Sequence, residues 1–475
     1  MEQQNVSSNR PVRPRRRKRS QLEIFKEAYL PAVIVCVALL MILIFIIGSI
    51  AHAVQRSKLE HNRQEALAQQ QLEEKKQLRA QADAALAQAD MLAAQYGYEE
   101  AIALLDALPA ATHNYQDVST KRAELVSKQQ TLVLWDDNSQ VVNLSFQLLI
   151  ADTQRAFADA NLADSYKKNF ITVTEFTKIL QQLYENGYML ISMDDIIEIT
   201  PSGDGGNIYE GKQLYLPEGK KPLILTQTNV NYNTYMVDGD GDKMPDKGGD
   251  GFASRLVIDE NGALACEIVM ADGTVETGAY DLVPILESFI ATHPDFSYKG
   301  ARAILAVTGY DGLFGYRTGS KAETELNATF RQSECDAVIP VIEKLRESGY
   351  DIACYTYGNT GYGSADMATI NDELNKWSSE VTDILGDCNI FVFAKNDITN
   401  TSTLYAGEKF NALYNAGFRY FLGFCNSGAP WSLCADTYVR QGRILVTGEN
   451  LKDHADWFTG IFDPTAVLDS TRNAS

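Results

Sequence analysis

Hydrophobic positions follow three different patterns in three successive regions of the chain. Between Ala28 and Gln55 there is no charged side chain, and residues 32–50 are almost wholly aliphatic. Residues 57–95 are rich in Ala, Gln, Glu, Lys and Leu and contain no Gly or Pro. From Leu132 onward, short apolar runs alternate with amphipathic stretches. These patterns predict a membrane helix, a helical stalk and an α/β domain.

The aliphatic region is long enough for one membrane span. About 20 apolar residues cross a ~30 Å hydrocarbon core as a helix, with every backbone group bonded inside the helix. A cleaved signal peptide is the alternative, because Ala51, His52 and Ala53 have the small-x-small shape of a cleavage site. The apolar region of a signal peptide is shorter, however, at about 7–15 residues. We therefore predict a retained signal anchor over residues 28–55.

The distribution of charge predicts the orientation of this anchor. Residues 1–19 contain seven basic side chains and one acidic one, so the net charge of −20 becomes −26 once the +6 of this segment is set aside. The positive-inside rule assigns residues 1–27 to the cytoplasm and residues 56–475 to the outside. An acidic body without a basic stripe argues against nucleic-acid binding.

The stalk is predicted to occupy residues 56–131. Its apolar spacing up to residue 95 is too irregular for a long coiled coil. From Ala89, apolar faces punctuated by Gly97 and Pro109 resemble one helical hairpin of the tetratricopeptide type. One such hairpin cannot bury a solenoid core. We interpret it as a spacer or self-association element, with peptide binding as the alternative.

Residues 132–475 alternate predicted strands with predicted helices. The strands are expected at 141–149, 223–225, 303–307, 352–355, 390–393, 420–424 and 444–446. The helices are expected at 176–186, 282–291, 335–348, 368–385 and 407–416. This alternation predicts a parallel sheet or barrel with crossover helices, in which functional residues follow the carboxyl ends of the strands.

Several of these segments resemble the polysaccharide deacetylases, carbohydrate esterase family 4, whose domain is also called the NodB homology domain. The resemblance covers about residues 140–450. It rests on the helix-plus-strand segment 176–196, on PLILTQTNVNYNTYM at 222–236, on GYDIACYTYGN at 349–359, on FVFAKND at 391–397 and on GFRYFLGF at 417–424. It implies an α/β domain with a NodB-like distorted (β/α) barrel, outside the membrane and close to cell-wall glycan.

The resemblance lies in framework and order, and the catalytic residues of the family are absent. In the family, an Asp-Asp pair supplies a general base and a metal ligand, and a His-x3-His pair supplies two further ligands. The first pair falls on Thr228 and Asn229 here, and the second falls on Tyr355 and Asn359. A neutral amide is a poor ligand for zinc-class metals. We therefore expect no zinc, and no hydrolysis by the mechanism of the family.

Polar and aromatic residues near the predicted strand ends suit a different role. Such side chains stack on sugar rings and form hydrogen bonds with sugar hydroxyls. The residues expected to bind ligand are Asn231, Tyr232, Arg317, Tyr357 and Trp431. Ordinary packing is the alternative for each aromatic residue, and a structural salt bridge is the alternative for Arg317.

An acidic loop at residues 237–251 has a spacing typical of calcium loops. Asp238, Asp240, Asp242 and Asp246 take positions 1, 3, 5 and 9, where oxygen ligands let a short loop wrap a hard cation. Position 6 is Lys243 instead of Gly, and position 12 is Gly249 instead of Glu, with the neighbouring Asp250 as a substitute. We expect Ca²⁺ as the cofactor of this loop, and a solvated acidic hairpin tip is the alternative.

Together, these features predict a single-pass cell-membrane protein with an extracellular, non-catalytic deacetylase-like domain that binds glycan or another envelope protein. One alternative is an active cell-wall polysaccharide (N-acetylglucosamine) deacetylase with an atypical site, and another is a structural or assembly factor of the envelope.

Six cysteines lie outside the span, which permits disulfides without fixing their pairing. An acidic body facing a polyanionic wall is repelled unless cations screen it, so we expect cation-dependent or uncharged contacts.

Overall fold

The computed structural model describes residues 21–158, 161–203, 205–399 and 402–473. The chain divides into two units, residues 1–81 and 82–475. The first helices are α1 (Gln21–Ile24), the π-helix η1 (Phe25–Tyr29) and the long helix α2 (Leu30–Ala94). Of the described helices, α2 alone is long and apolar enough to cross a membrane, and its most apolar window has a mean hydropathy of 3.3 with no residue buried.

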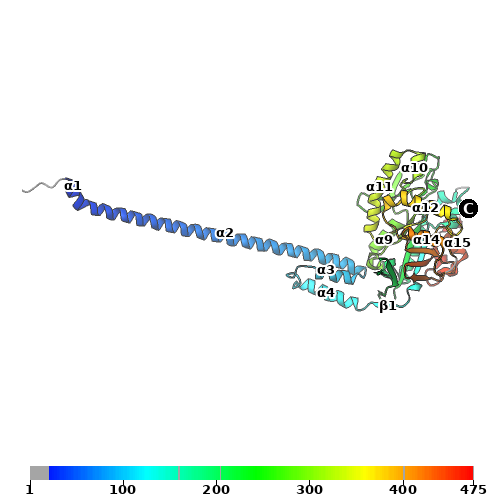
Figure 1. The fold of residues 1–475 in the computed structure, drawn as a ribbon, viewed down its shortest axis with the longest axis horizontal. Coiled ribbons are helices and arrows are strands. Elements are labelled where there is room, and N and C mark those ends of the chain that lie inside the picture. Colours follow the sequence, from blue (N-terminus) through cyan, green and yellow to red (C-terminus); the bar gives the residue numbers. More distant parts are fainter. Residues whose placement is uncertain (1–20, 159–160, 204, 400–401, 474–475) are drawn as a thin grey trace, which may run out of the picture. The chain divides into compact units, whose positions relative to one another are not determined.

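A small helical element opens the second unit. The last turns of α2 pack against α3 (Tyr98–Asp106) and α4 (Gln116–Gln129), which lie side by side (Figure 1). The core of this element contains Ala85, Ala89, Leu105 and Leu125. Alanines on α2 let α3 and α4 approach closely, because a methyl group is the smallest side chain that still buries apolar surface.

A closed parallel barrel forms the centre of the second unit. Its strands are β2 (Val142–Phe146), β7 (Lys221–Thr228), β11 (Ile304–Val307), β12 (Asp351–Cys354), β13 (Ile390–Val392), β14 (Tyr420–Phe424) and β16 (Tyr438–Leu445). Among the described residues these seven strands follow the order β11-β12-β13-β14-β16-β2-β7, and β7 pairs back to β11. The prediction of an α/β fold with a parallel barrel is confirmed, and each strand predicted for it is a strand of the barrel.

Strand β7 closes the barrel because it is long enough to have two neighbours on one edge. Its first residues pair with β3 (Tyr188–Leu190), in the register Lys221 to Tyr188. Its last residues pair with β11, in the register Thr226 to Ile304. Since all these strands are parallel, their carboxyl ends meet at one rim, which we call the barrel mouth.

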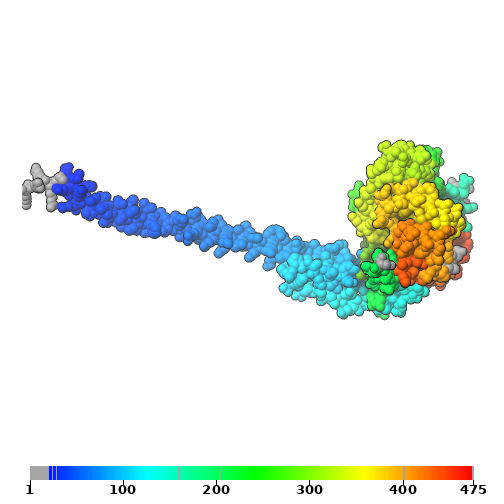
Figure 2. All heavy atoms as spheres, in the orientation of Figure 1, coloured from blue at the N-terminus to red at the C-terminus, as the bar shows by residue number. Residues whose placement is uncertain are grey.

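Two layers of apolar packing follow from the alternation of side chains along each strand. Inside the barrel lie Ile224, Ala306, Ala353 and Leu422, among other residues. The opposite faces of the strands pack against helices in a second core. These helices are α7 (Val173–Glu185), α9 (Leu282–Thr292), α11 (Ala328–Glu347), α12 (Met367–Glu380), α13 (Thr382–Leu385) and α14 (Glu408–Asn415). Figure 2 shows α11, α12 and α14 forming the surface on one face, in yellow-green to orange.

Smaller elements that the sequence did not indicate surround the barrel. The strands are β1 (Val133–Trp135) paired with β6 (Leu214–Leu216), β4 (Ile197–Pro201) with β5 (Asn207–Gly211), β8 (Arg255–Ile258) with β9 (Leu264–Val269) and β10 (Val275–Gly278), and β15 (Ser432–Ala435) with β16. The short helices are α5 (Thr153–Ala158), α6 (Ala163–Asn169), α8 (Thr234–Val237), α10 (Ser320–Glu325), α15 (Gly448–Asp453) and α16 (Pro464–Val467).

Candidate functional site

Strained backbone marks the loops that follow several barrel strands. Asn229 follows β7 with φ of 58°, Thr356 follows β12 with φ of 62°, and Lys395 follows β13 with φ of 54°. Residues with side chains rarely adopt positive φ, and such strain gathers at binding and catalytic sites because the surrounding structure must hold it. The barrel mouth is therefore the candidate functional site.

The two positions at the end of β7 carry no charge. Thr228 is buried, and its hydroxyl donates a hydrogen bond to the carbonyl oxygen of Phe146 at 3.1 Å. Asn229 is also buried, and its side-chain oxygen has no hydrogen-bond partner among the described residues. Neither side chain offers a carboxylate where the resemblance implies a base and a metal ligand.

The two positions after β12 lack imidazoles as well. Tyr355 lies inside the barrel, and its backbone amide donates to Val307 at 2.8 Å. Burial raises the pKa of the Tyr355 hydroxyl, and the nearby Arg443 together with a hydrogen bond to Thr228 partly offsets this shift. Asn359 has φ of 56° in the loop beyond. At neutral pH this loop therefore contributes a neutral phenol and a neutral amide.

A buried guanidinium stands among these residues. Arg443 shares the inward face of β16 with Val439, and it is 1% exposed. Its donors reach the carbonyl oxygens of Phe393 at 2.8 Å and Gly423 at 3.1 Å, and the hydroxyl of Ser145 at 2.9 Å. Burial lowers the pKa of Arg443 to about 10, so the group still carries its charge at neutral pH. The interior near the mouth thus holds a fixed positive charge.

A layer of neutral polar groups lies on the inward faces of the same strands. Asn143 on β2 donates to Gln441 on β16 at 2.9 Å and accepts from Thr226 on β7 at 2.9 Å. These groups satisfy one another, as buried polar groups must. They form one polar layer of the barrel interior, next to the apolar side chains that also lie there.

The four residues at the family's metal and base positions do not fit the divalent metal that the resemblance implies. Zinc-class metals take imidazole, thiolate or carboxylate ligands, and Thr228, Asn229, Tyr355 and Asn359 supply none of them. Histidine does not replace them: His293 stacks on Phe289 at 4.4 Å between ring centroids, and His454 stacks on Trp457 at 4.2 Å. The charge of Arg443 further repels a second cation in this interior.

Three of the residues expected to bind ligand form one buried network. Arg317 donates to the carbonyl oxygens of Tyr232 at 2.8 Å and Asp311 at 3.1 Å. Asn231 accepts from the amide of Thr308 at 2.9 Å and donates to its carbonyl oxygen at 2.8 Å. The hydroxyl of Tyr232 donates to Asp281 at 2.7 Å. Asn231, Tyr232 and Arg317 therefore fix the loop after β7 to the loop after β11 in this conformation.

Tyr357 is similarly engaged within the domain. Its hydroxyl donates to Glu380 at 2.8 Å, and its amide donates to Glu373 at 2.9 Å. The side chain is 7% exposed, which leaves little surface for a ligand. Tyr357 thus anchors the loop after β12 to α12.

Among the five residues expected to bind ligand, Trp431 differs from the other four because it lines an open cleft. The cleft has a volume of about 760 Å³ and opens beyond the ends of β13, β14 and β16. Its lining consists of Lys395, Asn396, Asp397, Thr399, Ser402, Phe424, Asn426, Ser427, Trp431, Arg440 and Leu445. We call it the Trp431 cleft. A tryptophan beside amides and hydroxyls is the combination that stacks on sugar rings and bonds their hydroxyls.

Buried groups hold Trp431 in position. The guanidinium of Arg440 lies 5.2 Å from the Trp431 ring and 3.7 Å from the Tyr405 ring. Asp397 binds Arg440 at 3.1 Å and accepts from the Tyr405 hydroxyl at 2.7 Å. Burial raises the pKa of Asp397, and Tyr405 and Arg440 partly offset the shift. Gly442 leaves room for the indole, because a Cβ there would overlap it.

Sequence reasoning missed Arg443, Lys395, Asp397 and Arg440. The segment YVRQGRIL at 438–445 carried one usable signal, since two arginines in a strand buried on both faces require internal partners. Lys395 and Asp397 gave no such signal.

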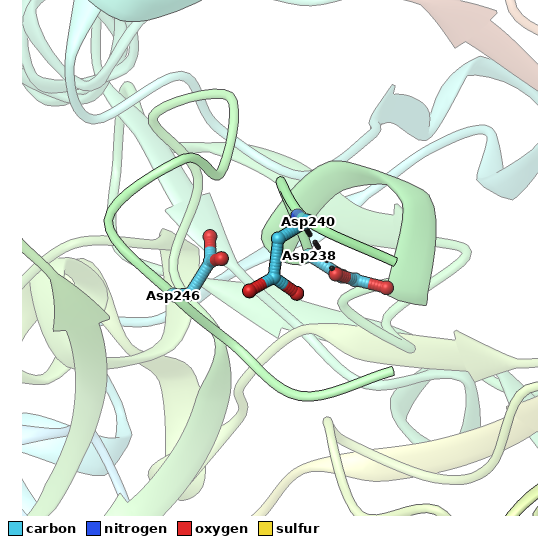
Figure 3. Close-up of side chains that lie close together, drawn as sticks. All are labelled: Asp238, Asp240 and Asp246. Atoms are coloured by element: carbon cyan, nitrogen blue, oxygen red, sulfur yellow. Dashed lines mark hydrogen bonds between the residues drawn. The ribbon is translucent and has the colours of Figure 1, made fainter. Parts of the chain in front are cut away.

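The acidic loop brings three of its four predicted ligands together. One carboxylate oxygen from each of Asp238, Asp240 and Asp246 lies within 4.8 Å of the others (Figure 3). Asp238 accepts the amides of Gly241 at 2.7 Å and Lys243 at 2.9 Å. Desolvation acts to raise the pKa of Asp238, but these backbone hydrogen bonds outweigh it and lower the pKa.

The remaining positions of the loop are arranged differently. Asp242 accepts the amide of Met244 at 2.7 Å and lies outside the cluster of three. Lys243 at position 6 has φ of 74°, so it adopts the backbone conformation that glycine usually supplies there. Asp250 accepts a hydrogen bond from Tyr166.

All seven cysteines are free thiols in the structure.

Among the comparisons with known proteins, only the comparison with solved structures gives matches. No protein-family model matches the chain, and no curated protein matches it. Among solved structures, the deacetylase PplD of Streptococcus pyogenes, solved in complex with acetate, matches 68% of this chain and 98% of its own chain. The two are 14% identical in sequence, with a TM-score of 0.34. A similarity at this level assigns neither a family nor an activity.

Proposed function

We propose that residues 132–475 form a polysaccharide-deacetylase-like domain that binds glycan without hydrolysing it, on the outer side of the cell membrane. The closed parallel barrel, together with the order of the segments that resemble the family, supports the fold. The observation that carries the loss of activity is the buried cation Arg443 near Tyr355, which is hydrogen-bonded to Thr228; Tyr355 and Thr228 are two of the four positions that would have to hold or serve a metal.

The Trp431 cleft supports glycan binding in particular. It lies at the carboxyl ends of parallel strands, where barrels carry their sites. It combines an aromatic ring with neutral hydrogen-bonding side chains, which suits an uncharged or weakly charged polyol better than a protein helix. Binding of another envelope protein is the competing role, and it predicts no saturable glycan binding.

Metal content and acetate release test the loss of activity. The full-length protein in detergent is incubated with zinc, cobalt or nickel at neutral pH, dialysed, and assayed for bound metal and for acetate released from acetylated chitooligosaccharide and peptidoglycan. The metal assay uses Asp240→Asn, which breaks up the three carboxylates of the acidic loop. We expect less than about 0.1 metal per chain, because the barrel mouth lacks the three protein ligands that a zinc-class site needs, and no acetate above a boiled control. Stoichiometric metal with acetate release would instead establish an active deacetylase with an atypical site.

Binding measurements test the cleft. Titration calorimetry with peptide-free wall glycan fragments should show saturable binding that Trp431→Ala weakens by roughly 10-fold, because stacking on one aromatic ring is worth about 1–2 kcal/mol. Tyr215→Ala is the matched control, since Tyr215 is an exposed aromatic residue on β6. If wild-type protein binds no glycan, the domain is better explained as a structural or assembly factor.

We also propose that the acidic loop binds Ca²⁺ through Asp238, Asp240 and Asp246. Three converging carboxylates and the positive φ at position 6 support this proposal. The lack of a carboxylate at position 12 makes us expect weak affinity, with a Kd of roughly 0.1–1 mM, as in extracellular modules. Terbium luminescence and its displacement by Ca²⁺ measure it. Asp240→Asn should abolish the signal, whereas Asp436→Asn, elsewhere on the surface, should preserve it.

A further inference from the structure

The charges that line the Trp431 cleft do not cancel. Asp397 is the only carboxylate among the described lining residues, and its charge is balanced by Arg440 at 3.1 Å. Lys395 is exposed and forms no ion pair within the described part of the chain. The cleft therefore has one uncompensated positive charge, on a chain whose net charge is −20.

The backbone holds Lys395 in a conformation that is costly for lysine. The amide of Asn396 donates to the carbonyl oxygen of Ala394 at 2.5 Å, which closes a γ-turn around Lys395 at φ of 54°. Glycine or asparagine would adopt this turn with less strain. The loop after β12 holds the turn in place, because Asn396 accepts the amide of Gly363 at 2.8 Å and donates to the hydroxyl of Ser364 at 3.1 Å.

A neutral donor and an aromatic ring share the cleft with this ammonium group. The side-chain amide of Asn426 has no hydrogen-bond partner among the described residues, and the indole of Trp431 lines the cleft with its Nε1 against Gly442. An ammonium, an amide and an indole together match a sugar that carries a carboxylate or phosphate. The ring would lie against Trp431, the hydroxyls would bond Asn426, and the oxyanion would meet Lys395.

We propose that the Trp431 cleft is selective for glycans that carry an oxyanion, and that Lys395 is the residue that determines this selectivity. This inference rests on the proposed glycan-binding function and refines it. It also revises the expectation of uncharged contacts, because an acidic domain can approach a polyanionic wall if its binding cleft has the opposite charge.

The test compares matched ligands on the full-length protein in detergent. The probes are a chitotetraose, a tetrasaccharide of the same length with muramic-acid carboxylates, the same compound with its carboxylates amidated, and a phosphorylated N-acetylglucosamine oligomer. We expect the carboxylated or the phosphorylated probe to bind about 3- to 10-fold tighter than the neutral ones, with an advantage that shrinks as salt rises. The two charged probes show which oxyanion is preferred.

Substitution of Lys395 separates this inference from the proposed function. Lys395→Asn keeps the turn, since asparagine tolerates positive φ, and it should bring the affinities for the charged and the neutral probes to the same value. Lys452→Asn, at an exposed lysine outside the cleft, should change neither. Equal affinity of the wild type for charged and neutral probes would refute oxyanion selectivity but retain glycan binding. Failure to bind any probe would refute both.

Discussion

Asp281 is the buried carboxylate that anchors the loop after β7. Its oxygens accept hydrogen bonds from the amide of Leu149 at 3.0 Å, from the side chain of Gln227 at 2.8 Å and from the hydroxyl of Tyr232 at 2.7 Å. Burial outweighs these contacts and raises the pKa of Asp281 to about 6. Asp281 therefore makes the free energy of unfolding depend on pH. Arg443, which is buried in the same way, makes it depend on whether its charge is kept.

The raised pKa of Asp281 predicts a specific pH dependence. The folded protein binds this proton more tightly than the unfolded chain, whose aspartates titrate near 3.8. The stabilisation is therefore complete below pH 3.8, declines as pH rises, and is lost above about 6. Lowering the pH from 7 to 5 should stabilise wild type by about 1 kcal/mol more than Asp281→Asn. Urea unfolding at both pH values measures this difference, and parallel behaviour of the two proteins would contradict it.

Removal of the Arg443 charge should weaken the fold. Arg443→Met leaves two carbonyl oxygens and a hydroxyl without their donor, so we expect the free energy of unfolding to fall by about 3 kcal/mol. Arg331→Met, at a partly exposed arginine, should cost about 1 kcal/mol or less. A gain in stability for Arg443→Met would mean that desolvation of the guanidinium outweighs its hydrogen bonds.

Helix α7 shows how an element depends on a distant part of the chain. Thr172 and Glu175 form a capping box at its start, which the sequence carries locally. The buried Glu175 is also paired with Arg472 near the C-terminus, through a hydrogen bond of 2.6 Å. Arg472 in turn donates to the carbonyl oxygen of Lys167 at 2.7 Å. The C-terminal segment thereby fastens the start of α7.

Loss of this ion pair should be severe. Arg472→Ala leaves Glu175 buried and unpaired, so we expect a loss of about 3–5 kcal/mol in the free energy of unfolding. The double variant Glu175→Gln, Arg472→Met keeps the cap and removes both charges, and it should recover more than half of that loss. Thermal unfolding of the two variants checks the ordering, and equal losses would show that packing, not charge, is responsible.

The elements also differ in how well local pattern predicts them. All seven barrel strands were indicated by apolar runs, because strands buried on both faces read as continuous hydrophobic segments. The paired strands β4–β5 and β8–β10 were missed, because they are partly exposed and their turns alone do not specify pairing. Strand β3 has three residues and is too short to give a period, so only the family resemblance, through the helix-plus-strand segment 176–196, indicated it.

The proposed orientation of the whole chain rests on its N-terminal charges and one apolar helix. In a Cys36→Ala variant, Cys434 is the remaining exposed thiol among the described cysteines. A membrane-impermeant maleimide applied to intact cells should label this variant. It should not label a second variant that carries both Cys36→Ala and Cys434→Ser. A cysteine introduced at Ser7 in that second variant should react only after permeabilisation. Labelling of Ser7→Cys in intact cells would reverse the proposed topology.

Residue identity and periodicity alone determined the apolar helix and the barrel strands, and the family resemblance assigned its metal positions to four residues without imidazole, thiolate or carboxylate groups: Thr228, Asn229, Tyr355 and Asn359. Each of these depends on neighbours in the sequence or on chemistry that no fold can change. The Trp431 cleft required the folded chain, because Lys395 follows β13 whereas Asn426 and Trp431 follow β14, and they meet only where parallel strands end at one rim. Sequence likewise cannot tell whether a polar side chain faces a cleft or a buried carbonyl. Burial separated Trp431 from Asn231, Tyr232, Arg317 and Tyr357.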